Sequence, residues 1–163
     1  MAQYTGKVWV LGDDIDTDII IPTEYLALKT IEDMKQYGFS PLRPELAGQI
    51  KPGDIIVAGK NFGCGSSREQ APSVLKALGV QAVVAKSFAR IFYRNALNNG
   101  LLLLEQPELH DVVKEGDTIT VTVNEDVEYN GKKYPIASLP ENLMEIIEAG
   151  GLVKAMRKRN GLD

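Results

Sequence analysis

One glycine-rich stretch holds the residues best suited to chemistry. Residues 63–68 read Gly-Cys-Gly-Ser-Ser-Arg and join a predicted strand over residues 54–58 to a predicted helix over residues 68–78. Glycines let the backbone approach a ligand closely, and the N–H groups that begin a helix attract an anion. Arg68 has the geometry to bind a carboxylate or a phosphate with two parallel hydrogen bonds. The stretch predicts a site for a small anion, although Ser66 or Ser67 also suits a plain helix cap.

Nucleotide ligands do not match this stretch. A P-loop places four residues between a glycine and a Gly-Lys-Ser or Gly-Lys-Thr triplet, and the spacing also misses the Gly-x-Gly-x-x-Gly pattern of dinucleotide-binding loops. A small carboxylate or phosphate is therefore the expected class of ligand.

Four aspartates form a second polar cluster after the first predicted strand: Asp13, Asp14, Asp16 and Asp18. The cluster lacks the glycine and the final glutamate of an EF-hand, which makes calcium an improbable ligand. We interpret most of these residues as an acidic turn with local hydrogen bonds and a solvated face. His110 follows in a polar stretch, where we predict a surface residue without a catalytic role.

Cys64 is the only cysteine of the chain. An internal disulfide is therefore impossible, and a reducing cytoplasm is the expected location. One thiolate also falls short of the about four ligands of an iron–sulfur cluster. The sequence thus predicts no metal site on this chain. Arg90 and Arg94 lie one turn apart on a predicted helix. They are either solvated side chains on a packed helix or part of a binding face.

Composition limits the classes of partner. With 163 residues and 44% hydrophobic content, the chain suits a single domain over residues 1–163. Its 22 acidic and 18 basic residues give a net charge of −4 without a basic stripe, so nucleic acid is not expected. The longest apolar runs are strand-sized, far below the roughly 20 residues of a membrane helix. We therefore expect a soluble protein without a membrane partner.

Hydrophobic patterning predicts an α/β fold. Strands over residues 7–11, 54–58, 82–85 and 101–104 alternate in part with helices over residues 68–78 and 88–98, which indicates a parallel sheet. Residues 118–123 alternate in polarity, and Asn130-Gly131 is a typical hairpin turn before a strand over residues 133–136. Helices are predicted over residues 31–38 and 140–158, the second interrupted at Gly150-Gly151. The expected fold is a mostly parallel central sheet with a C-terminal antiparallel hairpin plus helix.

Three blocks, residues 12–22, 63–69 and 85–95, resemble the small subunits of 3-isopropylmalate dehydratase and homoaconitase, in the aconitase superfamily. The resemblance runs nearly from end to end. It implies a swivelling β/β/α domain that closes over an active site whose [4Fe–4S] cluster is held by three cysteines of a separate large subunit, in a heterodimer or heterotetramer. It further implies a hydro-lyase that dehydrates and rehydrates a 2-hydroxy di- or tricarboxylate.

The resemblance also implies roles for single residues. Ser66 matches the base that removes a proton from the carbon next to a carboxylate, and Ser67 and Arg68 match contacts to substrate carboxylates. Asp18 matches a residue that supports the site by orienting a polar neighbour. As a physical hypothesis, the helix N-terminus, the loop N–H groups and Arg68 stabilise the Ser66 alkoxide in a site closed to water.

A further segment corresponds to the loop that reads the variable group of the substrate: Tyr25, Leu26, Ala27, Leu28, Lys29 and Thr30. Homoaconitase-type members resemble one another in placing Arg directly after the Tyr-Leu pair, where this chain has Ala27. Burying CH₂ or CH₃ groups contributes ~0.8 kcal/mol each, whereas an unpaired carboxylate is penalised. The loop therefore favours 3-isopropylmalate, a substrate of leucine biosynthesis. Citramalate, 2,3-dimethylmalate and, through Lys29, a tricarboxylate such as homoaconitate remain alternatives.

A different class of function also fits the glycine stretch. A non-catalytic regulatory domain that binds a small anion has the same local features, as does a purely structural subunit. A large chain with three cluster cysteines, encoded nearby, would favour the enzyme.

Overall fold

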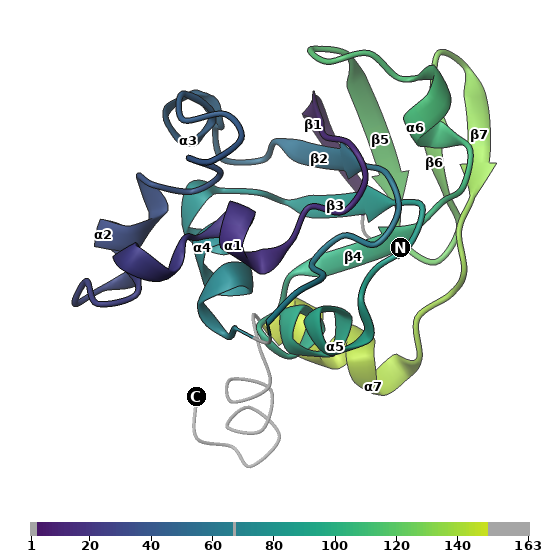
Figure 1. The fold of residues 1–163 in the computed structure, drawn as a ribbon. Helices are drawn as coiled ribbons and strands as arrows, with labels where there is room; N and C mark the ends of the chain where they lie inside the picture. Colours follow the sequence, from purple (N-terminus) through teal and green to yellow (C-terminus); the bar gives the residue numbers. More distant parts are fainter. Residues whose placement is uncertain (1–2, 67, 150–163) are drawn as a thin grey trace.

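The structure is a computed structural model that describes residues 3–66 and 68–149. Its strands form one seven-stranded sheet in the order β4-β3-β2-β1-β5-β6-β7 (Figure 1). The strands are β1 (Gln3–Val10), β2 (Ile55–Ala58), β3 (Ala82–Ala85), β4 (Leu102–Glu105), β5 (Thr118–Thr122), β6 (Asp126–Tyr129) and β7 (Lys132–Pro135). The sheet is therefore mixed, with a parallel half and an antiparallel half.

Strand β1 belongs to both halves of the sheet. Its last residues, from Val8 to Val10, pair in parallel with β2, and its first residues, from Gln3 to Lys7, pair antiparallel with β5. Strands β2 and β3 are apolar and buried at every position, as expected for parallel strands covered on both faces. The predicted parallel order is confirmed, with β3 lying between β2 and β4.

The antiparallel half is built by a tight hairpin. Asn130 and Gly131 have φ angles of 52° and 80°, the left-handed conformation that a two-residue turn of this type requires. They join β6 to β7, which confirms the predicted turn. The sequence did not reveal β6 or the pairing of β5 with β1.

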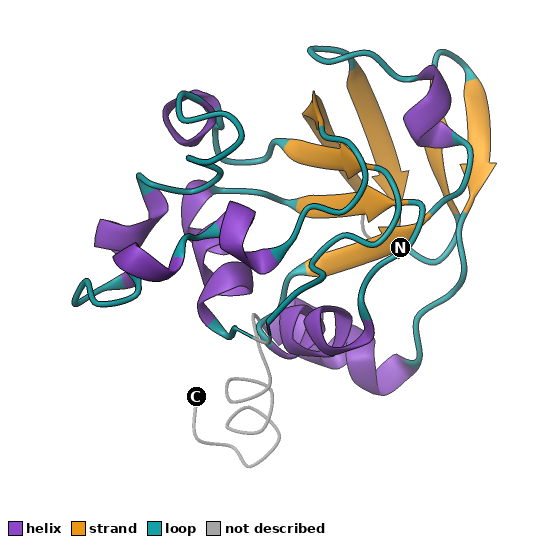
Figure 2. Cartoon of the chain, viewed as in Figure 1, coloured by secondary structure: helices purple, strands orange, loops and turns teal. Residues whose placement is uncertain are grey.

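Helices cover the two faces of the sheet unequally (Figure 2). One face packs against α1 (Thr17–Ile20), α2 (Ile31–Lys35), α4 (Gln70–Leu78) and α5 (Arg90–Asn98), with α3 (Leu46–Gln49) and the 3₁₀ turn η1 (Thr23–Tyr25) beside them. The other face packs against α6 (Leu109–Val112) and the curl of strands β5 to β7. Helix α7 (Glu141–Ala149) contacts α5. The remainder of the helix predicted over residues 140–158 lies outside the described residues.

Gln106 links the two edges of the sheet. It directly follows the edge strand β4, and its Nε2 donates to the carbonyl oxygen of Pro135 in the opposite edge strand at 3.1 Å. Its Oε1 accepts from the backbone N–H groups of Glu108 and Leu109, and only 1% of the residue is exposed. The sheet is therefore curled, with its first and last strands tied together.

Helix α4 starts later than predicted. Its N-cap is Glu69, without a side-chain capping bond, and not Ser66, one of the two candidates from the sequence. Pro72 supplies the reason, because proline has no N–H to donate and is tolerated only in the first helical turn. An earlier start would place Pro72 where an N–H donor is needed. Gly79 ends the helix in the left-handed conformation, as the sequence indicated.

His110 is less exposed than the sequence suggested. Its side chain is 21% exposed, and Nε2 lies 2.7 Å from the carbonyl oxygen of Leu11. Because a carbonyl only accepts, Nε2 carries the proton, and the residue ties α6 to the end of β1. Along residues 3–66 and 68–149, no helix is both long and apolar enough to cross a bilayer.

Candidate active site

The three sequence blocks meet at one edge of the sheet. Strands β1, β2 and β3 run in parallel, so the loops that follow them leave from the same side. Ligands of α/β sheets bind at this carboxyl edge. The topology therefore brings together segments that are far apart in the sequence.

Backbone hydrogen bonds continue the pairing of β1 and β2 into the loops beyond them. Four bonds follow in sequence, from the N–H to the carbonyl oxygen: Gly59 to Gly12 at 3.0 Å, Asp14 to Lys60 at 2.8 Å, Gly63 to Ile15 at 2.7 Å and Thr17 to Cys64 at 2.9 Å. The acidic loop and the glycine loop therefore form one ladder, whose end lies beside Ser66.

The loop after β3 closes on the other side of the glycine loop. Phe62 and Phe88 form a parallel bridge, and the N–H of Ala89 donates to the carbonyl oxygen of Phe62 at 3.0 Å. The N–H of Asn61 donates to Ser87 Oγ at 2.8 Å. The glycine loop is thus held between the other two blocks.

Two of the four aspartates of the acidic loop bind the glycine loop. Asp13 Oδ1 accepts from the backbone N–H of Lys60 at 2.7 Å, and Asp14 Oδ1 accepts from Asn61 Nδ2 at 3.1 Å. Only Asp16 makes the predicted local bond, accepting from the N–H of Ile19 as the N-cap of α1. The expectation of local hydrogen bonds is therefore wrong for Asp13 and Asp14, because a local pattern cannot reveal partners 47 residues away. Both residues are exposed, as expected.

Two glycines permit these close approaches. A Cβ at Gly59 would overlap the carboxylate of Asp13, and a Cβ at Gly63 would overlap the ring of Phe92. Gly63 also has a φ of 84°, which side chains rarely adopt. The loop therefore lies directly on α5.

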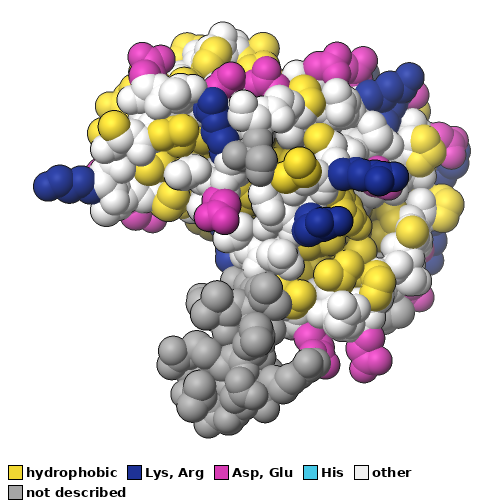
Figure 3. All heavy atoms as spheres, turned by 60° about the horizontal axis from the view of Figure 1, so that its bottom comes forward, with side chains coloured by type: hydrophobic (Ala, Val, Ile, Leu, Met, Phe, Trp, Pro, Cys, Tyr) yellow, Lys and Arg dark blue, Asp and Glu magenta, His cyan; other side chains and the backbone are white. Residues whose placement is uncertain are grey.

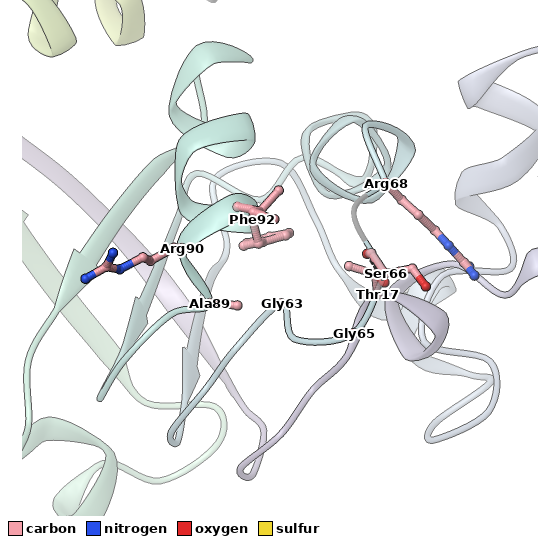
Figure 4. Close-up of a pocket in the computed structure, with 9 residues that line it drawn as sticks. Thr17, Gly63, Gly65, Ser66, Arg68, Ala89, Arg90 and Phe92 are labelled. Carbon is pink, nitrogen blue, oxygen red and sulfur yellow. Dashed lines mark hydrogen bonds between the residues drawn. The ribbon is translucent and has the colours of Figure 1, made fainter.

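A hollow of about 220 Å³ opens where the blocks meet (Figure 4). Its lining comes from all three of them: Thr17, Gly63, Gly65, Ser66, Arg68, Ala89, Arg90, Ile91 and Phe92. The structure therefore brings the predicted base, Ser66, and the predicted carboxylate-binding residue, Arg68, to one cavity.

Ser66 is solvent-exposed in the isolated chain, and a buried residue holds its backbone. Thr17 Oγ1 donates to the carbonyl oxygen of Ser66 at 2.7 Å, and Thr17 is 1% exposed. Sequence reasoning missed Thr17. The only signal was its place between Asp16 and Asp18 in the first block.

Arg68 is anchored toward the segment after α1. Its guanidinium donates to the carbonyl oxygen of Ile21 at 3.0 Å and to Thr23 Oγ1 at 2.8 Å, and it forms an ion pair with Asp18 at 2.5 Å. The Arg68 side chain is 12% exposed, and that of Asp18 is 58% exposed. Figure 4 shows Arg68 extending away from Phe92. Asp18 thus contacts a neighbouring polar group, and Ser67 lies outside the described residues.

The predicted specificity loop does not line this hollow. Tyr25 stacks on Tyr37 with ring centroids 3.9 Å apart, and Leu26 and Leu28 pack against the core. Thr30 caps α2 by accepting from the N–H of Asp33, whereas Ala27 and Lys29 are exposed. The loop is linked to the site indirectly, since Thr23, two residues before it, binds Arg68.

Cys64 does not have the features of a reactive thiol or a cluster ligand. Burial, and then the charges of Asp16 and Asp14, raise the pKa of the Cys64 thiol. Among residues 3–66 and 68–149, no three His, Cys, Asp or Glu side chains are placed to hold a metal ion.

Comparison with known proteins agrees with the resemblance noted in the sequence. A profile described as the aconitase C-terminal domain matches residues 24–109. The 3-isopropylmalate dehydratase small subunit of Lachnospira eligens is 78% identical, over 99% of this chain and 98% of that protein. That of Archaeoglobus fulgidus, small subunit 1, is 52% identical over 94% of this chain and 99% of that protein. The chain belongs to the 3-isopropylmalate dehydratase small-subunit family.

A solved structure of the family confirms the fold class. The crystal structure of 3-isopropylmalate dehydratase from Methanocaldococcus jannaschii matches with a TM-score of 0.92 and 39% identity, over 99% of this chain and 97% of that one. That chain therefore shares the mixed, curled sheet described above.

Proposed function

We propose that this chain is the small subunit of a 3-isopropylmalate dehydratase, a hydro-lyase that interconverts 2- and 3-isopropylmalate in leucine biosynthesis. The identity of 78% over nearly the whole chain carries the proposal. In it, the 163 residues act as a single swivelling domain in the cytoplasm, and activity requires the large subunit.

Ser66 is the base in this proposal. The isomerisation removes a proton from a carbon next to a carboxylate and a hydroxyl group from the adjacent carbon, and the addition then occurs in the opposite sense. A serine hydroxyl is far too weak an acid to become an alkoxide in water. Helix α4 begins at Gln70, four residues after Ser66, so Ser66 is not the N-cap of this helix. The alkoxide therefore depends on closure of the site against water.

Arg68 binds a substrate carboxylate in this proposal. Its ion pair with Asp18 neutralises the guanidinium in the open site, and its bonds to Ile21 and Thr23 fix the direction of the side chain. An anchored guanidinium loses little freedom when a carboxylate binds. Asp18 is thus proposed to orient Arg68, and Ser67 to contact the same carboxylate.

The [4Fe–4S] cluster belongs to the large subunit in this proposal. The described residues offer no metal-binding group, and the chain has one cysteine whose thiol pKa is raised. These residues do not fit a cluster. A bound cluster supplies a Lewis acid for a hydroxyl and a carboxylate, and this chain supplies the base and the arginine.

Selectivity is proposed to arise at residue 27. Ala27 is exposed, whereas Leu26 and Leu28 are partly buried against the core, so Ala27 is the position of that trio freest to face a substrate group. An apolar group there suits the isopropyl substituent of the substrate. Citramalate, 2,3-dimethylmalate and a tricarboxylate are the alternatives to test.

The test is reconstitution with the large subunit under anaerobic conditions, followed by assays of 2- and 3-isopropylmalate, citramalate, 2,3-dimethylmalate and homocitrate. We expect kcat/KM for the isopropylmalates to exceed that for homocitrate at least tenfold, about 1.4 kcal/mol. Equal rates on homocitrate and on the isopropylmalates would contradict the proposal that Ala27 determines selectivity. Anion binding to this chain without any turnover by the complex would favour a regulatory domain.

A further inference from the structure

An apolar side chain stands on the solvent face of α5. Ile91 is 59% exposed, more than Leu42 at 46% or Val112 at 45%, the other exposed large hydrophobic residues of the described chain. Arg90 and Arg94 are exposed beside it on the same helix, and helical geometry places the three within an arc of about 100°. We refer to Arg90, Ile91 and Arg94 as the α5 face.

The two arginines of the α5 face have no carboxylate partner within residues 3–66 and 68–149. The other two arginines of the described residues are paired, Arg43 with Glu115 and Arg68 with Asp18. The chain has four more acidic than basic residues. Two unpaired arginines on an acidic protein indicate that their counter-charges come from another molecule.

The α5 face lies at the rim of the hollow that contains Ser66. Arg90 and Ile91 both line that hollow. In Figure 4, Arg90 extends in the direction opposite to Arg68, outward from the cavity. Figure 3, which turns the lower part of Figure 1 with α5 and α7 toward the viewer, shows hydrophobic side chains gathered next to basic ones. A partner that covers Ser66 therefore meets this rim.

We infer that the α5 face is a docking surface for the large subunit, at a surface that offers an apolar recess for Ile91 and carboxylates for Arg90 and Arg94. The inference rests on the proposed function, which requires such a partner. Arginine and buried apolar side chains are typical of the residues that dominate binding energy at interfaces. A single exposed isoleucine is ordinary by itself. Its position at the open cavity, beside two arginines without a carboxylate partner among the described residues, distinguishes this one.

The first test compares Ile91→Asp with two control variants, Leu42→Asp near α3 and Val112→Asp on α6. Both control positions carry exposed hydrophobic side chains that lie outside the α5 face. The dissociation constant of the complex with the large subunit is measured by analytical ultracentrifugation. We expect Ile91→Asp to raise it at least tenfold and both matched variants to change it less than twofold. Equal effects of all three substitutions would contradict the proposal that the large subunit docks on the α5 face.

The second test addresses charge. The double variant Arg90→Glu with Arg94→Glu is expected to slow association at least tenfold at low salt and to flatten its salt dependence. The control is Lys132→Glu with Lys133→Glu on strand β7, which we expect to change the rate less than threefold. Identical salt dependence for both double variants would contradict the proposed charge pairing. A wild-type chain that binds no large subunit would instead contradict the proposed function, and with it this surface.

Discussion

At the scale of single residues, Thr17 fixes the position of Ser66. It is nearly fully buried, and its hydroxyl donates to the Ser66 carbonyl oxygen at 2.7 Å while its own N–H extends the backbone ladder to Cys64. A hydrogen bond of this kind contributes about 0.5–1.5 kcal/mol. The proposed base is therefore held by its backbone from the neighbouring loop.

Replacing Thr17 by valine keeps the shape of the side chain and removes the bond. In the reconstituted complex, we expect Thr17→Val to lower kcat about tenfold or more while KM changes less than threefold, because binding through Arg68 is retained. Thr17→Ser keeps the hydroxyl and is expected to restore most of the activity. Steady-state kinetics measures both.

The control for this prediction is Thr120→Val, which removes a hydroxyl from an exposed pair with Thr5, on strands remote from the hollow. Its kinetics should match those of the wild type. A Thr17→Val enzyme with normal kcat, or a Thr17→Ser enzyme as slow as Thr17→Val, would show that Ser66 does not depend on this bond.

Residue types alone predicted an anion site at the glycine stretch, and the family resemblance assigned its residues. Ser66 and Arg68 were expected to act together, and they line one hollow. Thr17 was not found, because a threonine carries no chemical signature until its partner is known. The alternative that Ser66 caps the helix is wrong for a local reason, the missing N–H of Pro72.

At the scale of elements, the loops after β1, β2 and β3 form one unit, and the sequence predicted the parallel strands that make this possible. Short elements were missed, since α1, α3 and α6 have four residues each, too few for a hydrophobic period to show. The pairing of β1 with β5 joins residues more than 110 apart, such as Lys7 with Thr118, and no local pattern encodes it.

An ion pair across elements reinforces this arrangement. Arg43, ahead of α3, binds Glu115, ahead of β5, through two bonds of 2.6 and 3.1 Å, and the N–H of Val10 also donates to Glu115. The hydrogen bond from Arg43, helped by that from Val10, lowers the pKa of Glu115 below its usual 4.5. The pair therefore links the start of the antiparallel half to the helical side.

The lowered pKa has a defined effect on stability. A carboxyl group with a depressed pKa in the folded state stabilises that state fully above its unfolded pKa of about 4.5, and the contribution disappears as the pH falls through the folded pKa. We expect Glu115→Gln to reduce the free energy of unfolding at pH 7 by less than about 1 kcal/mol, since the pair is partly exposed. The deficit should shrink steadily below pH 4.5.

Urea unfolding of both proteins from pH 7 to pH 3 measures this difference. Glu125→Gln, at an exposed carboxylate without an ion pair among the described residues, serves as the control and should cost nothing at any pH. A Glu115→Gln deficit that persists unchanged at pH 3 would exclude the ion pair as its cause.

At the scale of the whole molecule, the proposed function makes this chain half of an active site. The curled sheet, tied across its edges by Gln106, provides a rigid frame, and the hollow at its carboxyl edge is open beside the α5 face. The sequence indicated an incomplete site, because the family it resembles uses a [4Fe–4S] cluster and this chain has a single cysteine. It did not indicate where a partner docks, since exposure of Ile91 depends on the packing of α5.

The most direct test of the account is Ser66→Ala in the complex with the large subunit. Loss of a general base costs about 10²–10⁴ in rate, so we predict that kcat for 3-isopropylmalate falls at least a hundredfold. Substrate affinity, measured by calorimetry, should stay within threefold of wild type because Arg68 is unchanged. Undiminished turnover by Ser66→Ala would contradict the central claim that this chain supplies the base.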